Sequence, residues 1–303
     1  MIIRKVIAGV ELLIRSLPGV EIRERNPASE VFFAPGKLPA IDQQIHLQLS
    51  EEPIPVVEKE GAILFRAGNL WSIHWDNRFY RIVLHPPALQ YPLWVARLDH
   101  GFSQGVVYCS GHLKDSQNGK AILFNPVSYP LDQILLMHFL ANTGGMLIHA
   151  TGWLYHDSGW IFAGKSGAGK STLSNLIVKT TGSRFLSDDR IIIRKIGYEF
   201  LMYGTPWPGE AGYALNQSAP LKGIFFLKKG SQNIIRKLNP SDAVAGLMPV
   251  ASIPWYDREK VDLMMTFCDE MMGTVPMYEL SFVPDEAIVD MLVRFVNNSV
   301  HLG

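Results

Sequence analysis

Residues 159–172 read GWIFAGKSGAGKST, and this stretch decides the fold. The apolar residues 160–163 predict a strand, residues 164–171 match G-x-x-x-x-G-K-[ST] at every fixed position, and a helix is expected from about residue 170 to 179. Glycines allow the backbone to point successive N–H groups inward, and the positive end of the following helix adds to their attraction for an anion. The order of strand, glycine-rich turn and helix therefore predicts a site for nucleotide phosphates. A chance glycine turn before an ordinary helix is the alternative, which the flanking elements disfavour.

Each position of this loop suits a separate task. Lys170 is expected to reach the β and γ oxygens of a triphosphate, and Ser171 to offer its hydroxyl to the Mg²⁺ ion that bridges them. Thr172 is expected in the first turn of the helix. The sequence thus predicts ATP and Mg²⁺ as cofactors, with nucleotide contacts from Gly164, Lys165, Ser166, Gly167, Ala168, Gly169, Lys170, Ser171 and Thr172.

Two adjacent aspartates follow the predicted helix in the stretch SDDR, residues 187–190. Asp188 comes 18 residues after Lys170, which is enough chain for one helix, a turn and a short strand back to the loop. Beside phosphates, one carboxylate can accept a proton from an attacking hydroxyl while the other holds a metal ion or its water. We predict Asp188 as the base and Asp189 as the metal ligand. A pair that serves metal or water only, or a solvated turn, remains open.

A histidine and a proline-rich turn are further candidates. His149 lies in an apolar stretch, 15 residues before Gly164. Such a histidine is commonly a satisfied core residue, but near a phosphate it can donate a hydrogen bond or orient a carboxylate, so we include it among the catalytic candidates with Asp188 and Lys170. The PWPG turn at 206–209 can form a pocket wall or a rigid structural turn.

The part of the chain before residue 128 predicts a meander of strands, because short β-favouring runs alternate with turn residues. Examples are residues 45–49, 62–66, 81–84 and 105–109. Residues 69–80 (NLWSIHWDNRFY) predict a hairpin that turns at Asp76-Asn77. Asp132 is expected to cap a helix over 133–142 that Gly144-Gly145 closes.

These patterns predict an α/β protein of two domains. Residues 1–128 would form a smaller, mostly β domain that binds a substrate or partner, and residues 129–303 a phosphate-loop catalytic domain. In the second domain we expect strands at 146–154, 159–163, 184–186, 191–195, 223–227 and 277–282, and helices at 240–248, 257–268 and 285–297.

The composition narrows the possible partners and compartment. Lys plus Arg and Asp plus Glu each number 28, so the formal net charge is zero and no electrostatic footprint for nucleic acid is present. The two cysteines, Cys109 and Cys268, are far apart and indicate neither a disulfide framework nor a zinc site. Early charges such as Arg4 and Arg15 interrupt any signal-peptide core, and the apolar window 134–153 is too broken for a membrane span. We expect a cytoplasmic protein, with an oligomer of identical chains permitted by the apolar content.

The combined pattern resembles the HPr serine kinase/phosphorylase family. It rests on His149 in LIHATG, the loop at 164–171 and the DDR at 188–190, and it covers about residues 146–230. The resemblance implies a phosphate-loop core related to phosphoenolpyruvate carboxykinase. It also implies that His149 positions the reacting groups, that Lys170 binds phosphate, that Ser171 ligates Mg²⁺ and that Asp188 activates a protein serine.

Departures from that family make HPr itself an unsafe guess for the substrate. Thr172 stands where the family has glutamate after the loop serine, and the later E-x-R-G-L-G signature, implied to supply a metal ligand and to contribute to dephosphorylation, is absent. The PWPG turn and the APLKGIFFL stretch at 219–227 look more like divergent members of the family, some of which phosphorylate serine on small peptide precursors. The expected acceptor is therefore a serine of a peptide or protein.

Three other functions stay open on the residues alone. A small-molecule kinase for an amino acid, sugar or nucleoside would use Asp188 in the same way. A nucleotide hydrolase or switch is disfavoured because neither N-K-x-D nor L-S-G-G-Q occurs. A regulator that binds nucleotide without transferring phosphate is disfavoured because every expected catalytic residue type is present.

Overall fold

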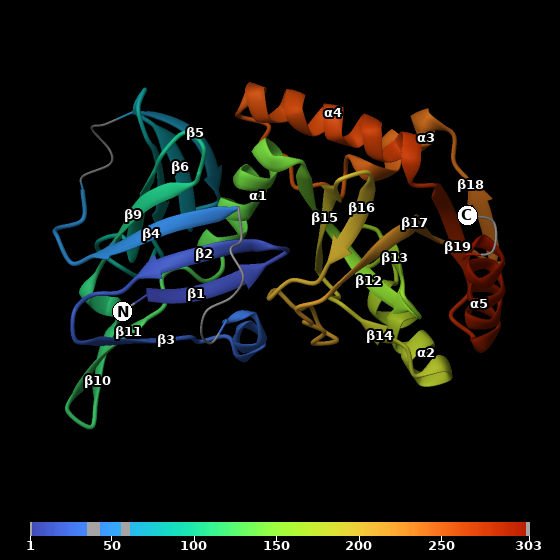
Figure 1. The fold of residues 1–303 in the computed structure, drawn as a ribbon, viewed down its shortest axis with the longest axis horizontal. Coiled ribbons are helices and arrows are strands. Elements are labelled where there is room, and N and C mark those ends of the chain that lie inside the picture. Colours follow the sequence, from blue (N-terminus) through green and yellow to red (C-terminus); the bar gives the residue numbers. More distant parts are fainter. Residues whose placement is uncertain (1, 35–42, 56–60, 301–303) are drawn as a thin grey trace. The chain divides into compact units, whose positions relative to one another are not determined.

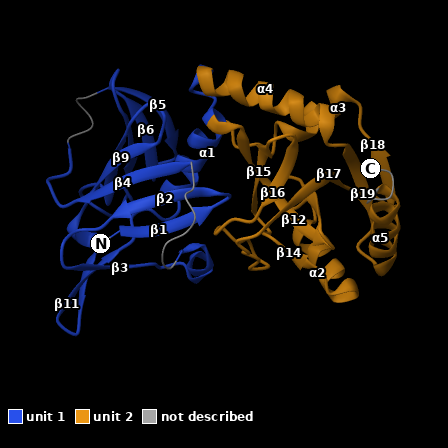
Figure 2. Ribbon diagram, viewed as in Figure 1, with its two compact units in different colours: residues 1–142, 254–258 blue, residues 143–253, 259–303 orange. Residues whose placement is uncertain are grey.

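The structure, a computed structural model, describes residues 2–34, 43–55 and 61–300 of this mixed α/β chain. The chain folds into two compact units (Figure 2). Unit 1 comprises residues 1–142 and 254–258, and unit 2 comprises residues 143–253 and 259–303. The chain therefore passes from one unit to the other three times.

Unit 1 is built on an eight-stranded sheet, which includes many of the blue and teal strands in Figure 1. Its buried face is here called the inner face and its exposed face the outer face. In β4 the apolar Ile45, Leu47 and Leu49 are buried while His46 and Gln48 are exposed, the alternation of a sheet with one wet face. The strand order is β1 (Ile2–Ile7), β2 (Val10–Arg15), β4 (Gln44–Ser50), β9 (Gln104–Cys109), β8 (Trp94–Leu98), β7 (Tyr80–Leu84), β6 (Trp71–Trp75) and β5 (Ala62–Ala67). The four strands used as examples from the sequence are all confirmed.

The hairpin predicted around Asp76-Asn77 is confirmed as β6 and β7. Asn77 has a φ of 69°, and the Asp76 carboxylate accepts hydrogen bonds from the N–H groups of Arg78 and Phe79. A second, three-stranded sheet contains β10 (Lys114–Gln117), β11 (Lys120–Phe124) and β3 (Val20–Arg23). Short 3-10 helices span Pro27–Phe32 and Gly111–Leu113.

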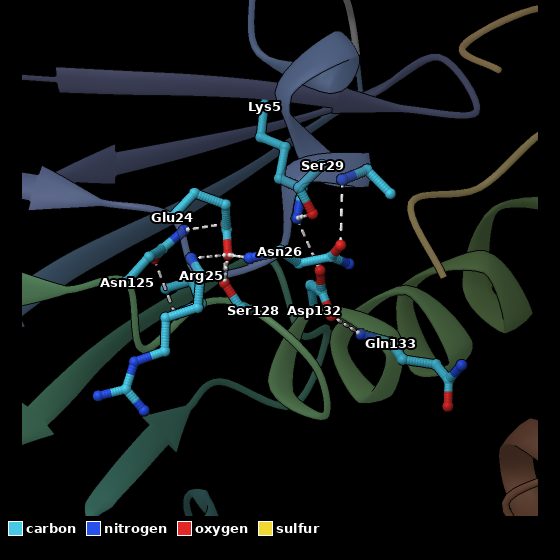
Figure 3. A network of polar contacts seen from close by, with 11 residues as sticks. Lys5, Glu24, Arg25, Asn26, Ser29, Asn125, Ser128, Asp132 and Gln133 are labelled. Carbon is cyan, nitrogen blue, oxygen red and sulfur yellow. Dashed lines mark hydrogen bonds and ion pairs between the residues drawn. The ribbon is translucent and has the colours of Figure 1, made fainter. Parts of the chain in front are cut away.

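The predicted capping role of Asp132 is wrong. Helix α1 (Leu131–Thr143) begins before this residue, and the Asp132 side chain is buried. Its Oδ2 lies 2.8 Å from Nζ of Lys5, whose side chain is also fully buried, in a polar network that Ser29 joins (Figure 3). The aspartate is thus used to neutralise a lysine of β1, which no local sequence pattern announces.

Unit 2 is organised around strands that change neighbours along their length. Gly145–His149 of β12 (Gly145–Tyr155) pair with β15 (Arg190–Ile196), and Ala150–Tyr155 pair with β13 (Ser158–Ala163). Likewise β17 (Ser218–Lys229) pairs with β16 (Glu199–Tyr203) at its start and with β13 further on. The remaining strands are β14 (Arg184–Phe185), β19 (Met277–Phe282) and β18 (Ile234–Lys237). His149 therefore lies where β12 exchanges one partner for another.

The helices of unit 2 include α2 (Lys170–Thr181), α3 (Pro240–Leu247) and α5 (Glu286–Val300), while α4 (Arg258–Thr274) starts at the last residue of unit 1. Leu173 and Ile177 of α2 share one apolar core with Ile288 and Leu292 of α5 and with the large side chains of β12, β13 and β17. This core fixes the start of α2 against the end of β13. No helix within the described ranges is long and apolar enough to span a membrane.

Candidate functional site

The loop at 164–169 connects the buried strand β13 directly to α2, as predicted. Gly167 and Gly169 have φ of 77° and 100°, a region that glycine enters without strain. Space is also limiting: a Cβ on Gly169 would lie 2.8 Å from the Phe282 ring, and one on Gly164 would lie 2.8 Å from Cβ of Ala168. The three glycines are therefore required by the backbone path and by close packing.

Lys170, the first residue of α2, has its ammonium group inside the loop. Its Nζ donates to the carbonyl oxygens of Gly164 at 2.7 Å and Lys165 at 3.3 Å, and lies 2.8 Å from Nε2 of His149. Only 8 % of the residue is exposed. Burial lowers the pKa of Lys170 from its ordinary value; the nearby Arg190 acts in the same direction and Asp189 opposes it. An ammonium held by uncharged acceptors keeps a net positive charge that an anion can neutralise.

His149 links the lysine to one of the aspartates. Because an ammonium group only donates, Nε2 of His149 must accept, and the ring proton belongs on Nδ1. Nδ1 lies 3.1 Å from Oδ1 of Asp189, and Oδ2 of Asp189 lies 3.1 Å from Nε of Arg190. Burial acts to raise the pKa of Asp189, but the hydrogen bond from His149 and the charge of Arg190 outweigh it and hold that pKa below its ordinary value.

The backbone explains why Asp189 meets His149. The N–H of Ala150 donates to the carbonyl of Asp189, and the N–H of Gly152 donates to that of Ser187, so residues 187–189 run alongside β12. β14 and β15 continue this pairing on either side. The predicted return of Asp188 to the glycine loop thus occurs through β12, and Asp189 comes with it.

Asp188 faces the other way and holds a different loop. Its carboxylate accepts hydrogen bonds from the N–H groups of Gly209 at 2.8 Å, Ala211 at 2.6 Å and Tyr213 at 3.2 Å. Its carbonyl accepts from the hydroxyl of Thr151 at 3.1 Å, and 4 % of the residue is exposed. A carboxylate has about four lone-pair positions, so three such bonds fix its orientation and leave about one position open.

These residues surround one cavity of about 420 Å³. Of the predicted site residues, its lining contains His149, Ser166, Gly167, Gly169, Lys170, Ser171, Thr172, Asp188 and Asp189. Gly164 and Lys165 contribute through the carbonyls that hold Lys170, and Ala168 packs within the loop. Loop, histidine and both aspartates therefore meet at one place.

Gly209, the last residue of the PWPG turn, and Glu210, which the sequence did not single out, also line this cavity. Trp207 of the PWPG turn is buried, and it is the glycine ending that turn which reaches the cavity. A Cβ on Gly209 would lie 3.0 Å from Oδ2 of Asp188, so a side chain there would crowd the carboxylate. Glu210 could have been predicted from the sequence, because it directly follows the PWPG turn.

The protein groups available to a metal ion are few. Within the described ranges, no three His, Cys, Asp or Glu side chains gather closely enough to hold one. The lining does contain Ser171 and Asp189, a hydroxyl and a carboxylate residue. That pair suits Mg²⁺, which proteins commonly bind through one or two side chains together with phosphate oxygens and water.

Comparison with known proteins finds a similarity of structure. No protein-family model matches the chain, and no curated protein matches it. A solved structure, the Hpr(Ser) kinase/phosphatase from Coxiella burnetii, is similar over 51% of this chain and 98% of its own length, with 14% sequence identity and a TM-score of 0.32. What the site can do is therefore argued from its own residues.

Proposed function

We propose that this protein is an ATP- and Mg²⁺-dependent kinase that transfers the γ-phosphoryl group to a hydroxyl, that of a serine in a peptide or protein. The observation that carries the proposal is the Lys170 ammonium. It is enclosed by the carbonyls of the glycine loop and by His149, in the same cavity as two aspartates. A buried cation with neutral partners beside carboxylates suits the transfer of a phosphoryl group to a hydroxyl.

The loop and the start of α2 would bind the phosphates of ATP. N–H groups of residues 164–169 and the positive end of α2 attract the phosphate oxygens, and Lys170 neutralises charge on the transferred group. Ser171 and Asp189 would hold Mg²⁺, which supplies additional neutralisation when bound. His149 would position both Lys170 and Asp189, because one ring nitrogen contacts the lysine and the other the aspartate.

Asp188 would accept the proton of the attacking hydroxyl. Its carboxylate lines the cavity and is fixed by three backbone N–H groups, so the remaining lone-pair position has a defined direction. The hydroxyl oxygen forms a bond to the γ-phosphorus while the bond to the β,γ-bridging oxygen breaks, which releases ADP. Positioning of this kind supplies much of the rate in phosphoryl transfer.

The test is incubation with γ-labelled ATP, Mg²⁺ and a panel of serine peptides, proteins and small hydroxyl compounds. We expect label on a peptide or protein serine, and a decrease of about 10²- to 10⁴-fold in Asp188→Asn, as for loss of a general base. Asp290→Asn is the matched control, because Asp290 is an exposed aspartate of α5 outside the cavity.

Each other outcome corrects a stated part of the proposal. Transfer that persists in Asp188→Asn excludes Asp188 as the base. Label on small hydroxyl compounds alone excludes the peptide acceptor, and release of labelled phosphate without any acceptor identifies a hydrolase. If the labelled ATP stays intact both with every acceptor and without any acceptor, the protein is neither a kinase for these acceptors nor a hydrolase.

A further inference from the structure

The outer face of the large sheet in unit 1 carries a row of cationic and polar side chains. The strand pairings place Arg15 of β2 next to Gln48 of β4, Gln48 next to Val106 of β9, and Val106 next to Arg97 of β8. Directly paired residues project from the same face of a sheet. Arg15 and Arg97 therefore share one face, three strand spacings of about 4.8 Å apart, or about 14 Å between their backbones.

A second row runs beside the first. Leu13 is paired with His46, and His46 with Gln104, two residues before each member of the first row on β2, β4 and β9. The exposed side chains of His46 and Gln48 show that this face is not covered within the described part of the chain. The two rows together give a mixed face, on which two arginines and three other polar side chains lie beside the apolar Leu13 and Val106.

Aromatic rings hold Arg97. Its guanidinium group lies 5.1 Å from the centre of the Phe79 ring and 5.8 Å from that of Tyr108, and Arg78 lies 5.0 Å from the same Phe79 ring. Stacking on aromatic faces orients a guanidinium group and leaves its N–H donors free at the edge. Among the residues that the structure describes, neither Arg15 nor Arg97 has a carboxylate ion-pair partner.

The acidic residue beside these arginines is occupied by its own loop. The carboxylate of Asp99 accepts hydrogen bonds from the backbone N–H groups of Ser103 and Gln104 and from the Ser103 hydroxyl. These bonds partly balance its charge and hold it at the turn between β8 and β9. The two arginines thus give the face an excess of positive charge, although the whole chain has a formal net charge of zero.

The rows form the floor of a cavity of about 630 Å³, here named the outer-face cavity, whose lining includes Arg15, His46, Gln48, Phe79, Arg97 and Asp99. Small-molecule sites commonly measure about 300–1,000 Å³. We propose that the outer-face cavity binds a small organic anion carrying at least two carboxylate or phosphate groups, one toward Arg15 and one toward Arg97. Two guanidinium groups at opposite ends of a concave surface select for an elongated anion with a charge at each end.

Calorimetric titration of the full chain at low salt tests this site, with citrate as the carboxylate probe and inorganic pyrophosphate, which has two phosphate groups, as the phosphate probe. Pyrophosphate is titrated into Lys170→Met, which removes the loop lysine. We expect saturable citrate binding that weakens about tenfold or more in Arg15→Gln and in Arg97→Gln, the loss of a charge-assisted contact. Pyrophosphate bound through the same two arginines would support the site and show that phosphate groups satisfy it as carboxylates do.

The matched control is Arg25→Gln, because Arg25 also stacks on an aromatic ring, that of Phe124, but lies outside the cavity. We expect Arg25→Gln and Lys170→Met to bind citrate as the original chain does. Arg15 is exposed at the end of β2, so Arg15→Gln remains informative even if loss of the stacked Arg97 impairs folding.

Four outcomes would overturn the proposal. The first is equal citrate affinity in Arg15→Gln and the original chain, and the second is loss of citrate binding in Lys170→Met. The third is that neither citrate with the original chain nor pyrophosphate with Lys170→Met binds at millimolar concentration. The fourth is arginine-dependent binding of an acidic peptide but of neither probe, which would identify a peptide-binding face. None of these results bears on phosphoryl transfer in unit 2.

Discussion

Two lysines, one in each unit, are buried to a similar degree and held in opposite ways. Lys5 in unit 1 has the Asp132 carboxylate 2.8 Å away, so its charge is neutralised within the protein. For Lys170 in unit 2, the hydrogen bonds recorded among the described residues go to two carbonyls and an imidazole. A buried lysine with a carboxylate partner serves the fold, whereas one held by neutral groups keeps a charge available for a ligand.

The largest effect is expected when Lys170, whose direct hydrogen-bond partners are uncharged, is removed. Lys170→Met should reduce phosphoryl transfer by about 10³-fold, because an electrostatic donor to the transferred group is lost. Stability should change little, because removing the buried ammonium group also removes the free-energy cost of taking it out of water. The measurement is labelled transfer together with the thermal unfolding midpoint. Lys179→Met, an exposed lysine of the same helix, is the control, and an equal loss in both variants would contradict the assignment.

The neutralised lysine should show the opposite behaviour. Lys5→Met leaves the buried Asp132 carboxylate without this partner and should lower the free energy of unfolding by about 3–5 kcal/mol. Denaturant unfolding measures this change. Lys114→Met is the matched control, because Lys114 pairs with Glu51 on the surface and should contribute about 1 kcal/mol or less. A change at Lys5 as small as that at Lys114 would remove the basis of the comparison.

A smaller effect is expected from the histidine that joins Lys170 to Asp189. His149→Asn should reduce transfer by about 10- to 100-fold, since it disturbs the lysine and the carboxylate while removing neither. The pH–rate profile separates positioning from mere loss of structure: a positioning role shifts its limbs, whereas a structural role lowers it uniformly. A profile that keeps its shape and height in His149→Asn would show that the contact has no part in the reaction.

The smallest effect concerns the dependence of stability on pH. The pKa of Asp189 is lowered in the folded protein from an ordinary value of 3.8. As pH falls, the Asp189 carboxylate therefore takes up a proton in the unfolded chain before it does so in the folded protein. Its contribution to the free energy of unfolding is complete above the pKa of the unfolded chain, and it is lost as pH falls through the pKa of the folded protein. Asp189→Asn should make the unfolding midpoint fall less steeply between about pH 5 and about pH 3. An identical slope in Asp290→Asn and Asp189→Asn would contradict this.

Local patterns predicted the glycine-rich loop between its strand and its helix, because these elements are specified by residues close in sequence. The strand at 277–282 and the helix starting at Lys170 were predicted at their observed bounds. Helix and strand periodicity also identified the hairpin at Asp76-Asn77. These elements need only their own side chains and turn residues to be recognised.

The contacts that the sequence did not predict all join residues that are distant in the chain. Asp132 was expected to cap a helix, but it pairs with Lys5, 127 residues away. The three N–H groups that hold Asp188 come from residues 209–213, and the contact between His149 and Lys170 depends on two strands and a helix meeting. Tertiary structure decides such contacts, so a single sequence carries little trace of them.

The change of neighbours along β12 also bears on how long the site survives under stress. At this point the N–H of His149 donates to Val250 and the N–H of Ala150 donates to Asp189, so the strand is tied on both sides. Protons on such amides exchange with solvent only through large openings, at a free energy near that of global unfolding. The histidine should therefore keep its place until unit 2 melts, and heat inactivation should coincide with melting of the unit.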